Sequence, residues 1–193
     1  MQDFSMYFGL GWNHIISWEA LDHILFILAL AVIYRFEDWR RVLILVTAFT
    51  IGHFLTLILS VTEVIRANSE WVEFLIPLTI VITALFNLFK PNLQSATNAF
   101  LYTLTLVFGL VHGLGYANAI RFLLVEEQSL GWSLFAFNLG LEIGQIVVVL
   151  AALILGELVL RYTPLQRRYW VVIVSSIVIL VAMNMVIDRV PNI

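Results

Sequence analysis

Residues 19–34 read Glu19-Ala-Leu-Asp22-His23-Ile-Leu-Phe-Ile-Leu-Ala-Leu-Ala-Val-Ile-Tyr34. This stretch indicates both the fold class of the chain and where its polar residues should meet. The segment is apolar enough to enter a lipid bilayer, yet a carboxylate and an imidazole stand side by side near its start. Ionisable groups inside a membrane are costly, and they almost always pair with one another or face the interior of a bundle. We therefore expect Asp22 and His23 to meet partners from other membrane-embedded segments.

The whole chain shares this apolar character. Of its 193 residues, 62% are hydrophobic and only 12% are charged, and the mean hydropathy is +0.99. Soluble domains have about 25% charged residues, whereas several apolar runs in this chain have the length of about 20 residues that crosses a bilayer. The composition predicts an all-α membrane protein that forms a single transmembrane helical domain over residues 1–193.

Polar and charged loops divide the chain into six predicted transmembrane helices, at residues 18–34, 42–61, 72–89, 98–124, 131–160 and 169–187. The loops on one side hold seven Lys and Arg residues and those on the other side hold three: Arg35, Arg40, Arg41, Lys90, Arg161, Arg167 and Arg168 against Arg66, Arg121 and Arg189. Cytoplasmic loops are enriched in Lys and Arg. We therefore predict an N-out/C-out bundle, with His14 outside the membrane at the surface or mouth.

Several classes of protein are excluded by composition. Cysteine is absent, which excludes disulfides, thiolate metal ligands and a cysteine nucleophile. The basic residues are scattered among loops, so no nucleic-acid partner is expected. The first 13 residues contain no Lys or Arg and thus lack the basic region of a signal peptide. The first transmembrane helix is therefore expected to stay in the protein.

Three later residues, His53, His112 and Glu142, are the candidate partners of Asp22 and His23. A rise of 1.5 Å per residue and a hydrocarbon core about 30 Å thick put all five in the outer half of the membrane. Polar stripes at helical spacing predict that these side chains face the bundle interior. Glycines near His112 and Glu142 are expected to let other helices approach closely: Gly109, Gly113, Gly115, Gly140 and Gly144.

Together these residues predict one intramembrane metal site, formed by Asp22, His23, His53, His112 and Glu142. Imidazoles with one or two carboxylates suit a divalent ion such as Ni²⁺ or Zn²⁺. Asp22 either binds the ion or accepts the second ring N–H of a ligating histidine. The alternative is structural, because a histidine in a membrane helix often only hydrogen-bonds to another helix.

Four segments carry a resemblance: Leu21-Asp22-His23-Ile-Leu-Phe-Ile-Leu, Thr47-Ala-Phe-Thr-Ile-Gly-His53-Phe-Leu-Thr, Val72-Glu73 through Ala84-Leu-Phe-Asn87, and Phe108-Gly-Leu-Val-His112-Gly-Leu-Gly-Tyr-Ala. They resemble the HupE/UreJ hydrogenase and urease accessory membrane proteins. The resemblance implies a multi-pass protein of the bacterial inner membrane and a permease for nickel or another divalent metal. Nickel permeases of this kind place a further histidine a few residues before the Asp-His pair, and the nearest one here is His14.

Three functions remain open at the level of sequence. The first is a secondary transporter for a divalent cation, which the five site residues would bind. The second is an intramembrane zinc-dependent hydrolase, in which the same residues hold the metal and Asp22 or Glu142 acts as a general base. The third is a metal sensor or assembly partner. The expected partners are a divalent metal ion and the lipid bilayer, and the sequence leaves a homo-oligomer open.

Overall fold

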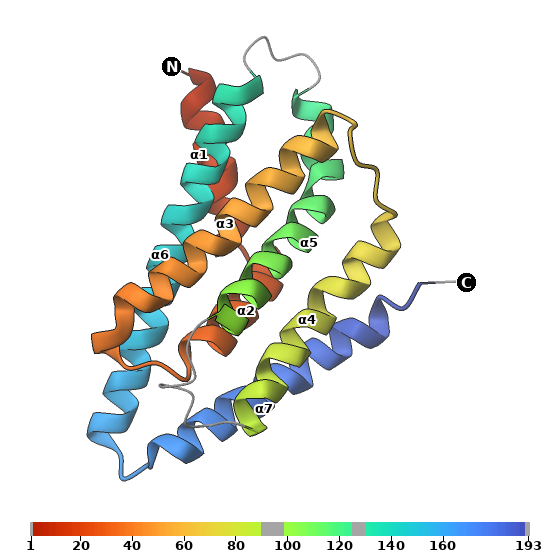
Figure 1. The fold of residues 1–193 in the computed structure, drawn as a ribbon. Coiled ribbons are helices and arrows are strands. Elements are labelled where there is room, and N and C mark those ends of the chain that lie inside the picture. Colours follow the sequence, from red (N-terminus) through yellow and green to blue (C-terminus); the bar gives the residue numbers. More distant parts are fainter. Residues whose placement is uncertain (1, 90–98, 125–129, 192–193) are drawn as a thin grey trace.

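A computed structural model describes residues 2–89, 99–124 and 130–191, and the described residues are helical and contain no strand. Figure 1 shows the bundle that the helices form. Its elements are α1 (Gln2–Ile16), the 3₁₀ turn η1 (Trp18–Ala20), α2 (Leu21–Ala31), the 3₁₀ turn η2 (Phe36–Asp38), α3 (Trp39–Val61), α4 (Ser69–Phe89), α5 (Ala99–Leu124), α6 (Leu130–Tyr162) and α7 (Arg167–Asp188). The predicted loop position of Lys90 lies outside the described residues.

The N-terminal region differs most from the prediction. In place of one helix over residues 18–34, α1 and α2 are separated by a break and bent by 65°. Ser17 is extended, with ψ of 158°, and so ends α1 before the turn η1 begins. With 11 residues, α2 rises only about 17 Å, roughly half of the hydrocarbon thickness. The two helices together therefore form either a broken span or a re-entrant segment.

Four helical segments are long and apolar enough to cross a membrane: residues 36–61, which include η2, and the helices α4, α6 and α7. The bent pair α1–α2 raises the number of candidate spans to five among the described residues. On α5, which has 26 residues, the apolar stretch within the described part of the chain is Leu101–Ala117. The membrane character is thus confirmed, whereas the number of six spans and the N-out/C-out orientation stay predictions.

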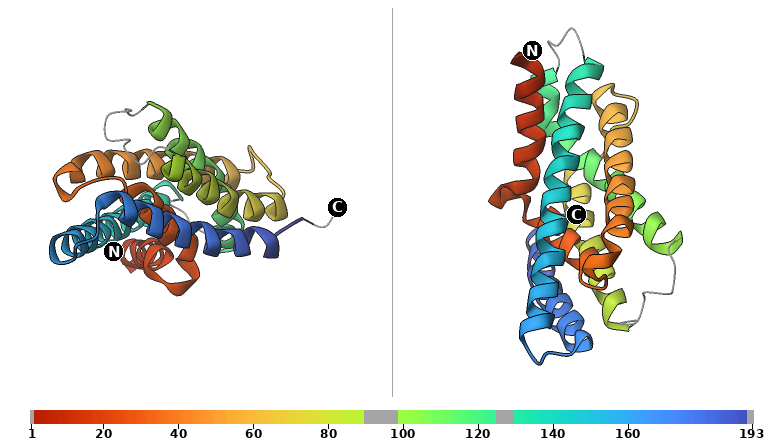
Figure 2. Two further views of the ribbon diagram at one scale, coloured as in Figure 1. Left: turned by 90° about the horizontal axis from the view of Figure 1, so that it is seen from below. Right: turned by 90° about the vertical axis from the view of Figure 1, so that its left-hand side faces the viewer.

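Glycines allow two pairs of helices to pack closely. On α5, a Cβ atom at Gly109 or Gly113 would collide with the backbone of α3 at Phe49 or His53. On α6, a Cβ atom at Gly140 would collide with the backbone of α1 at Phe8. Figure 2 shows α1 running along α6. The close approach predicted at these three glycines is confirmed, whereas Gly115 and Gly144 face side chains of α4 and α1 instead.

Three phenylalanines form a cluster that we call the aromatic floor: Phe26 of α2, Phe49 of α3 and Phe108 of α5. The rings of Phe26 and Phe108 are 3.7 Å apart between centroids, and those of Phe49 and Phe108 are 5.5 Å apart. All three are buried. Each stands four residues, about one helical turn, from Asp22, His53 or His112. The floor therefore underlies the polar residues that these helices contribute.

Candidate metal centre

Three histidines from three helices meet in the bundle. His14 stands near the end of α1, His23 near the start of α2, and His112 in the middle of α5. Each offers a ring nitrogen, and these three atoms lie within 4.8 Å of one another. The ring centroids are 4.6 Å apart for His14 and His23 and 4.0 Å apart for His23 and His112. The break between α1 and α2 brings the first two rings together, since a straight helix would separate them.

The spacing of the three nitrogens fits a transition-metal ion. Metal–imidazole bonds are about 2.0–2.1 Å long, so neighbouring nitrogens of a tetrahedral site lie about 3.4 Å apart. Three atoms within 4.8 Å of one another leave a point within about 2.8 Å of each, so every imidazole has to move inward by less than about 1 Å. Small rotations of the side chains are sufficient for this movement.

Asp22 orients His23. The backbone N–H of His23 and its ring Nδ1–H both donate to Asp22 Oδ1, at 2.8 and 3.0 Å. This second bond places the ring hydrogen on Nδ1 and leaves the lone pair of Nε2 free to bind a metal. Among the described residues, His23 Nε2, His14 Nε2 and His112 Nδ1 are buried and have no hydrogen-bond partner. Unpaired nitrogens of this kind are suited to an ion.

Two of the three histidines, His14 and His112, line a cavity of about 170 Å³, which we call the mouth. Its lining includes His14, Asp22, His112, Glu73, Tyr116 and Arg189. Glu73 is exposed, and its carboxylate accepts a hydrogen bond of 3.1 Å from the Ser69 hydroxyl. Arg189 Nη1 lies 4.0 Å from Asp22 Oδ2. The mouth thus holds both a carboxylate that attracts a cation and a guanidinium that repels one.

His53 is near the three histidines but separate from them. Its ring centroid is 6.1 Å from that of His14 and 6.3 Å from that of His112. The residue is completely buried, and neither ring nitrogen has a hydrogen-bond partner among the described residues. His53 is not part of the group whose nitrogens lie within reach of one ion. Its role as a ligand therefore stays a prediction.

Glu142 lies apart from the predicted cluster. Its Oε1 accepts a 2.8 Å hydrogen bond from Thr47 Oγ1, and both residues line a separate cavity of about 200 Å³ between α3 and α6. Thr47 precedes His53 by six residues on α3, or about 9 Å along the helix axis. The similar depth that the sequence predicted for Glu142 and His53 did not imply contact. Glu142 meets α3 at Thr47, which lies about two helical turns before His53.

Sequence reasoning missed His14 as a member of the group, since residues 1–15 were expected outside the membrane. Two signals point to it. Tyr7, Gly11, His14 and Ile15 follow the helical spacing i, i+4, i+7 and i+8. Nickel permeases of the kind that the sequence resembles also have a histidine a few residues before the Asp-His pair, and His14 stands eight residues before Asp22. The spacing predicts a helix with one packed face, and α1 has this face against α6.

Comparison with known families supports the resemblance. A family model described as HupE / UreJ protein matches residues 1–189, essentially the whole chain. No curated protein and no solved structure matches the chain.

Proposed function

Because this chain belongs to the HupE/UreJ family, we propose that it transports a divalent metal ion, Ni²⁺ or Zn²⁺, across a bacterial inner membrane. The observation that carries the proposal is the group formed by His14, His23 and His112, whose nitrogens lie within 4.8 Å of one another. Asp22 adds a negative charge and orients His23. The ion is the cargo of this site.

The ligand set suits transport of a borderline cation. Imidazole nitrogens bind nickel and zinc well, whereas magnesium and calcium prefer oxygen ligands. Three protein ligands leave coordination positions open for water. A transported ion must also leave its site. Three protein ligands bind the ion less tightly than the four ligands of a closed structural zinc site.

The residues around the site support entry of a cation through the mouth. The mouth includes the carboxylate of Glu73, which attracts a cation, and it reaches His14 and His112 directly. The aromatic floor lies one helical turn away from the polar residues, so an ion at the histidines faces apolar rings in that direction. Passage across the membrane then requires the helices that carry Phe26, Phe49 and Phe108 to move apart, as in alternating access.

Protons provide a means of release. A metal binds to neutral imidazole, so protonation of the histidines competes with the cation. A proton gradient across the membrane would therefore drive exchange at this site. Neither the family match nor the geometry favours the zinc-dependent hydrolase that was the alternative at the level of sequence.

The first experiment measures metal binding to the purified full chain. Calorimetry gives the affinity, and mass spectrometry gives the metal content. We expect one Ni²⁺ or Zn²⁺ per chain, and loss of binding in His14→Ala, His23→Ala and His112→Ala. Glu142→Gln is the matched control, because Glu142 lies in another cavity, and it should bind normally. Proteoliposomes should take up the same ion in a manner that depends on these histidines.

Two results would contradict the proposal. If the native protein binds neither ion, the histidines have only a structural role in helix packing. Protein that binds a stoichiometric ion in proteoliposomes yet moves none would exclude transport and leave a sensor or an assembly role.

A further inference from the structure

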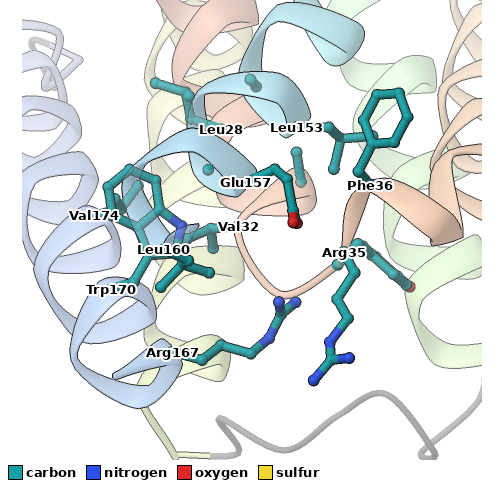
Figure 3. A pocket seen from close by; sticks show the side chains of 14 residues that line it. Leu28, Val32, Arg35, Phe36, Leu153, Glu157, Leu160, Arg167, Trp170 and Val174 are labelled. Carbon is teal, nitrogen blue, oxygen red and sulfur yellow. The ribbon is translucent and has the colours of Figure 1, made fainter. Parts of the chain in front are cut away.

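A second polar region lies far from the metal centre. On α6, Phe137 packs against His14, with 5.9 Å between ring centroids, and Glu157 follows twenty residues later, about 30 Å along the helix. Near Glu157 a small hollow of about 20 Å³ forms where the end of α2, the second half of α6 and the start of α7 meet (Figure 3). Its wall is apolar and consists of Leu28, Val32, Leu153, Leu160, Trp170 and Val174.

The rim of the hollow is basic. Figure 3 shows Arg35 and Arg167 at its edge, below the apolar side chains. Arg167 is held in place, since its Nη2–H donates a 2.8 Å hydrogen bond to the carbonyl of Ile33. A wider space of about 670 Å³ continues outward along Arg161 and is also lined by Arg35 and Arg167. The arginines of this rim thus come from three different segments of the chain.

Carboxylates stand near the rim, since Glu157 lines it and Asp38 accepts a hydrogen bond from the backbone N–H of Arg35, but among the described residues no close ion pair occupies its guanidinium groups. The linings of the two spaces contain three arginines and two carboxylates, Arg35, Arg161, Arg167, Glu37 and Glu157. Within the described part of the chain, none of these arginines forms an ion pair shorter than 4.0 Å with a carboxylate. The rim therefore offers several guanidinium donors to an anion, and Arg recognises phosphate especially well.

We propose that this hollow binds an anionic phospholipid. Its phosphate lies in the wider space and contacts Arg35, Arg161 and Arg167, and an acyl chain runs over the open edge of the hollow beside Trp170. A basic pocket between transmembrane helices is suited to an acidic headgroup, and the bilayer supplies such lipids at high local concentration. A zwitterionic lipid is disfavoured, because its ammonium group would stand beside the arginines.

The lipid would also support the metal centre indirectly. The hollow encloses the C-terminal end of α2 at Leu28, Ala31 and Val32, and Asp22 and His23 lie at the opposite end of the same short helix. A lipid that lies across the opening of the hollow contacts all three elements and so holds α2 against α6 and α7. We therefore expect bound lipid to raise the thermal stability of the protein. This effect does not depend on the transported ion.

The test is native mass spectrometry of the full chain in detergent, titrated with phosphatidylglycerol and, separately, phosphatidylcholine. We expect clear preference for phosphatidylglycerol and a melting temperature that rises with it. Arg35→Gln and Arg161→Gln should each weaken binding by about fivefold, from the loss of one positive charge near the headgroup. The matched control is Arg168→Gln, which removes the same charge next to Arg167 but outside the lining.

Three results would overturn the proposal. Equal binding of the two lipids would remove the role of the headgroup charge. An equal loss in Arg168→Gln and Arg35→Gln would reduce the effect to general attraction by a basic surface. Glycerol phosphate that binds as well as the intact lipid would show that the apolar wall is unused and that the site takes a free phosphate. Arg35 and Arg161 are exposed, and melting curves of Arg35→Gln and Arg161→Gln without lipid verify that these variants fold.

Discussion

Arg189 is the positive charge nearest to Asp22 among the described residues, and it is expected to oppose a cation at the proposed site. Its guanidinium lies 4.0 Å from Asp22 Oδ2, and about a third of its side chain is exposed. In the absence of an ion it balances the buried carboxylate of Asp22. A divalent cation at the proposed histidine site would take over this role, and the guanidinium at its present position would repel that cation. Arg189 is therefore expected to lower the affinity of the proposed site for a cation without binding the ion itself.

We therefore expect Arg189→Gln to bind Ni²⁺ or Zn²⁺ about fivefold more tightly, the effect of roughly 1 kcal/mol from one partly screened charge. Calorimetry with the purified chain measures this change. Arg66→Gln is the control, because Arg66 pairs with Glu63 at 2.9 Å and does not line the mouth. Unchanged or weaker binding in Arg189→Gln would show that the guanidinium does not compete with the ion.

Asp22 is expected to act through His23. Replacing it with Asn removes the charge and weakens the bond that fixes the hydrogen on Nδ1 of His23. Partners of metal-bound histidines typically contribute 10–100-fold in affinity, so Asp22→Asn should lower metal affinity by about that factor. Asp38→Asn, in the turn η2, is the control. Metal titrations measure both variants, and native affinity in Asp22→Asn would contradict the orienting role.

At the scale of elements, the pair α3–α5 depends on glycine. A Cβ atom at Gly109 would meet the backbone of Phe49, which cannot move aside as a side chain can. We expect Gly109→Ala to destabilise the protein by about 1–3 kcal/mol, as overpacking does. Gly9→Ala is the control, because nothing lies within 4 Å of the added atom. Thermal unfolding in detergent compares the two, and equal melting temperatures would contradict this packing.

The helices that the sequence predicts best are those with strong local signals. Residues 42–61, 72–89, 131–160 and 169–187 were expected as helices, and α3, α4, α6 and α7 extend these ranges by one to three residues. Charged or polar loops mark their ends. The break at Ser17 had no such signal, since neither Pro nor Gly stands there. Tertiary packing of α1 against α6, mediated by Gly11 and Gly140, determines this part of the fold.

The same difference in sequence signal explains which site residues could be predicted from the sequence. Asp22, His23 and His112 were predicted together and do lie together, because ionisable residues in apolar helices must face inward. Glu142 also faces inward, but its partner is Thr47. Depth along the helices could be estimated from sequence, whereas lateral neighbours depend on how the helices pack. His14 was missed for this reason, since its position depends on the bend between α1 and α2.

For the whole molecule, the orientation in the membrane determines from which side a metal ion would reach the proposed site. The mouth includes Glu73 at the start of α4 and Arg189 just after α7, and the count of Lys and Arg assigns this end to the outside. The end that holds Arg35, Arg161 and Arg167 is therefore predicted to face the cytoplasm. The proposed uptake of an ion from outside depends on this assignment.

Because the chain contains no cysteine, single cysteines can test the orientation without further changes. Val64, in the loop before α4, is 70% exposed, and Thr163, in the loop before α7, is also exposed. In intact cells a membrane-impermeant maleimide should label Val64→Cys and not Thr163→Cys, and it should label both after the membrane is permeabilised. The reverse pattern would place the mouth in the cytoplasm, and the same histidines would then load the ion for export.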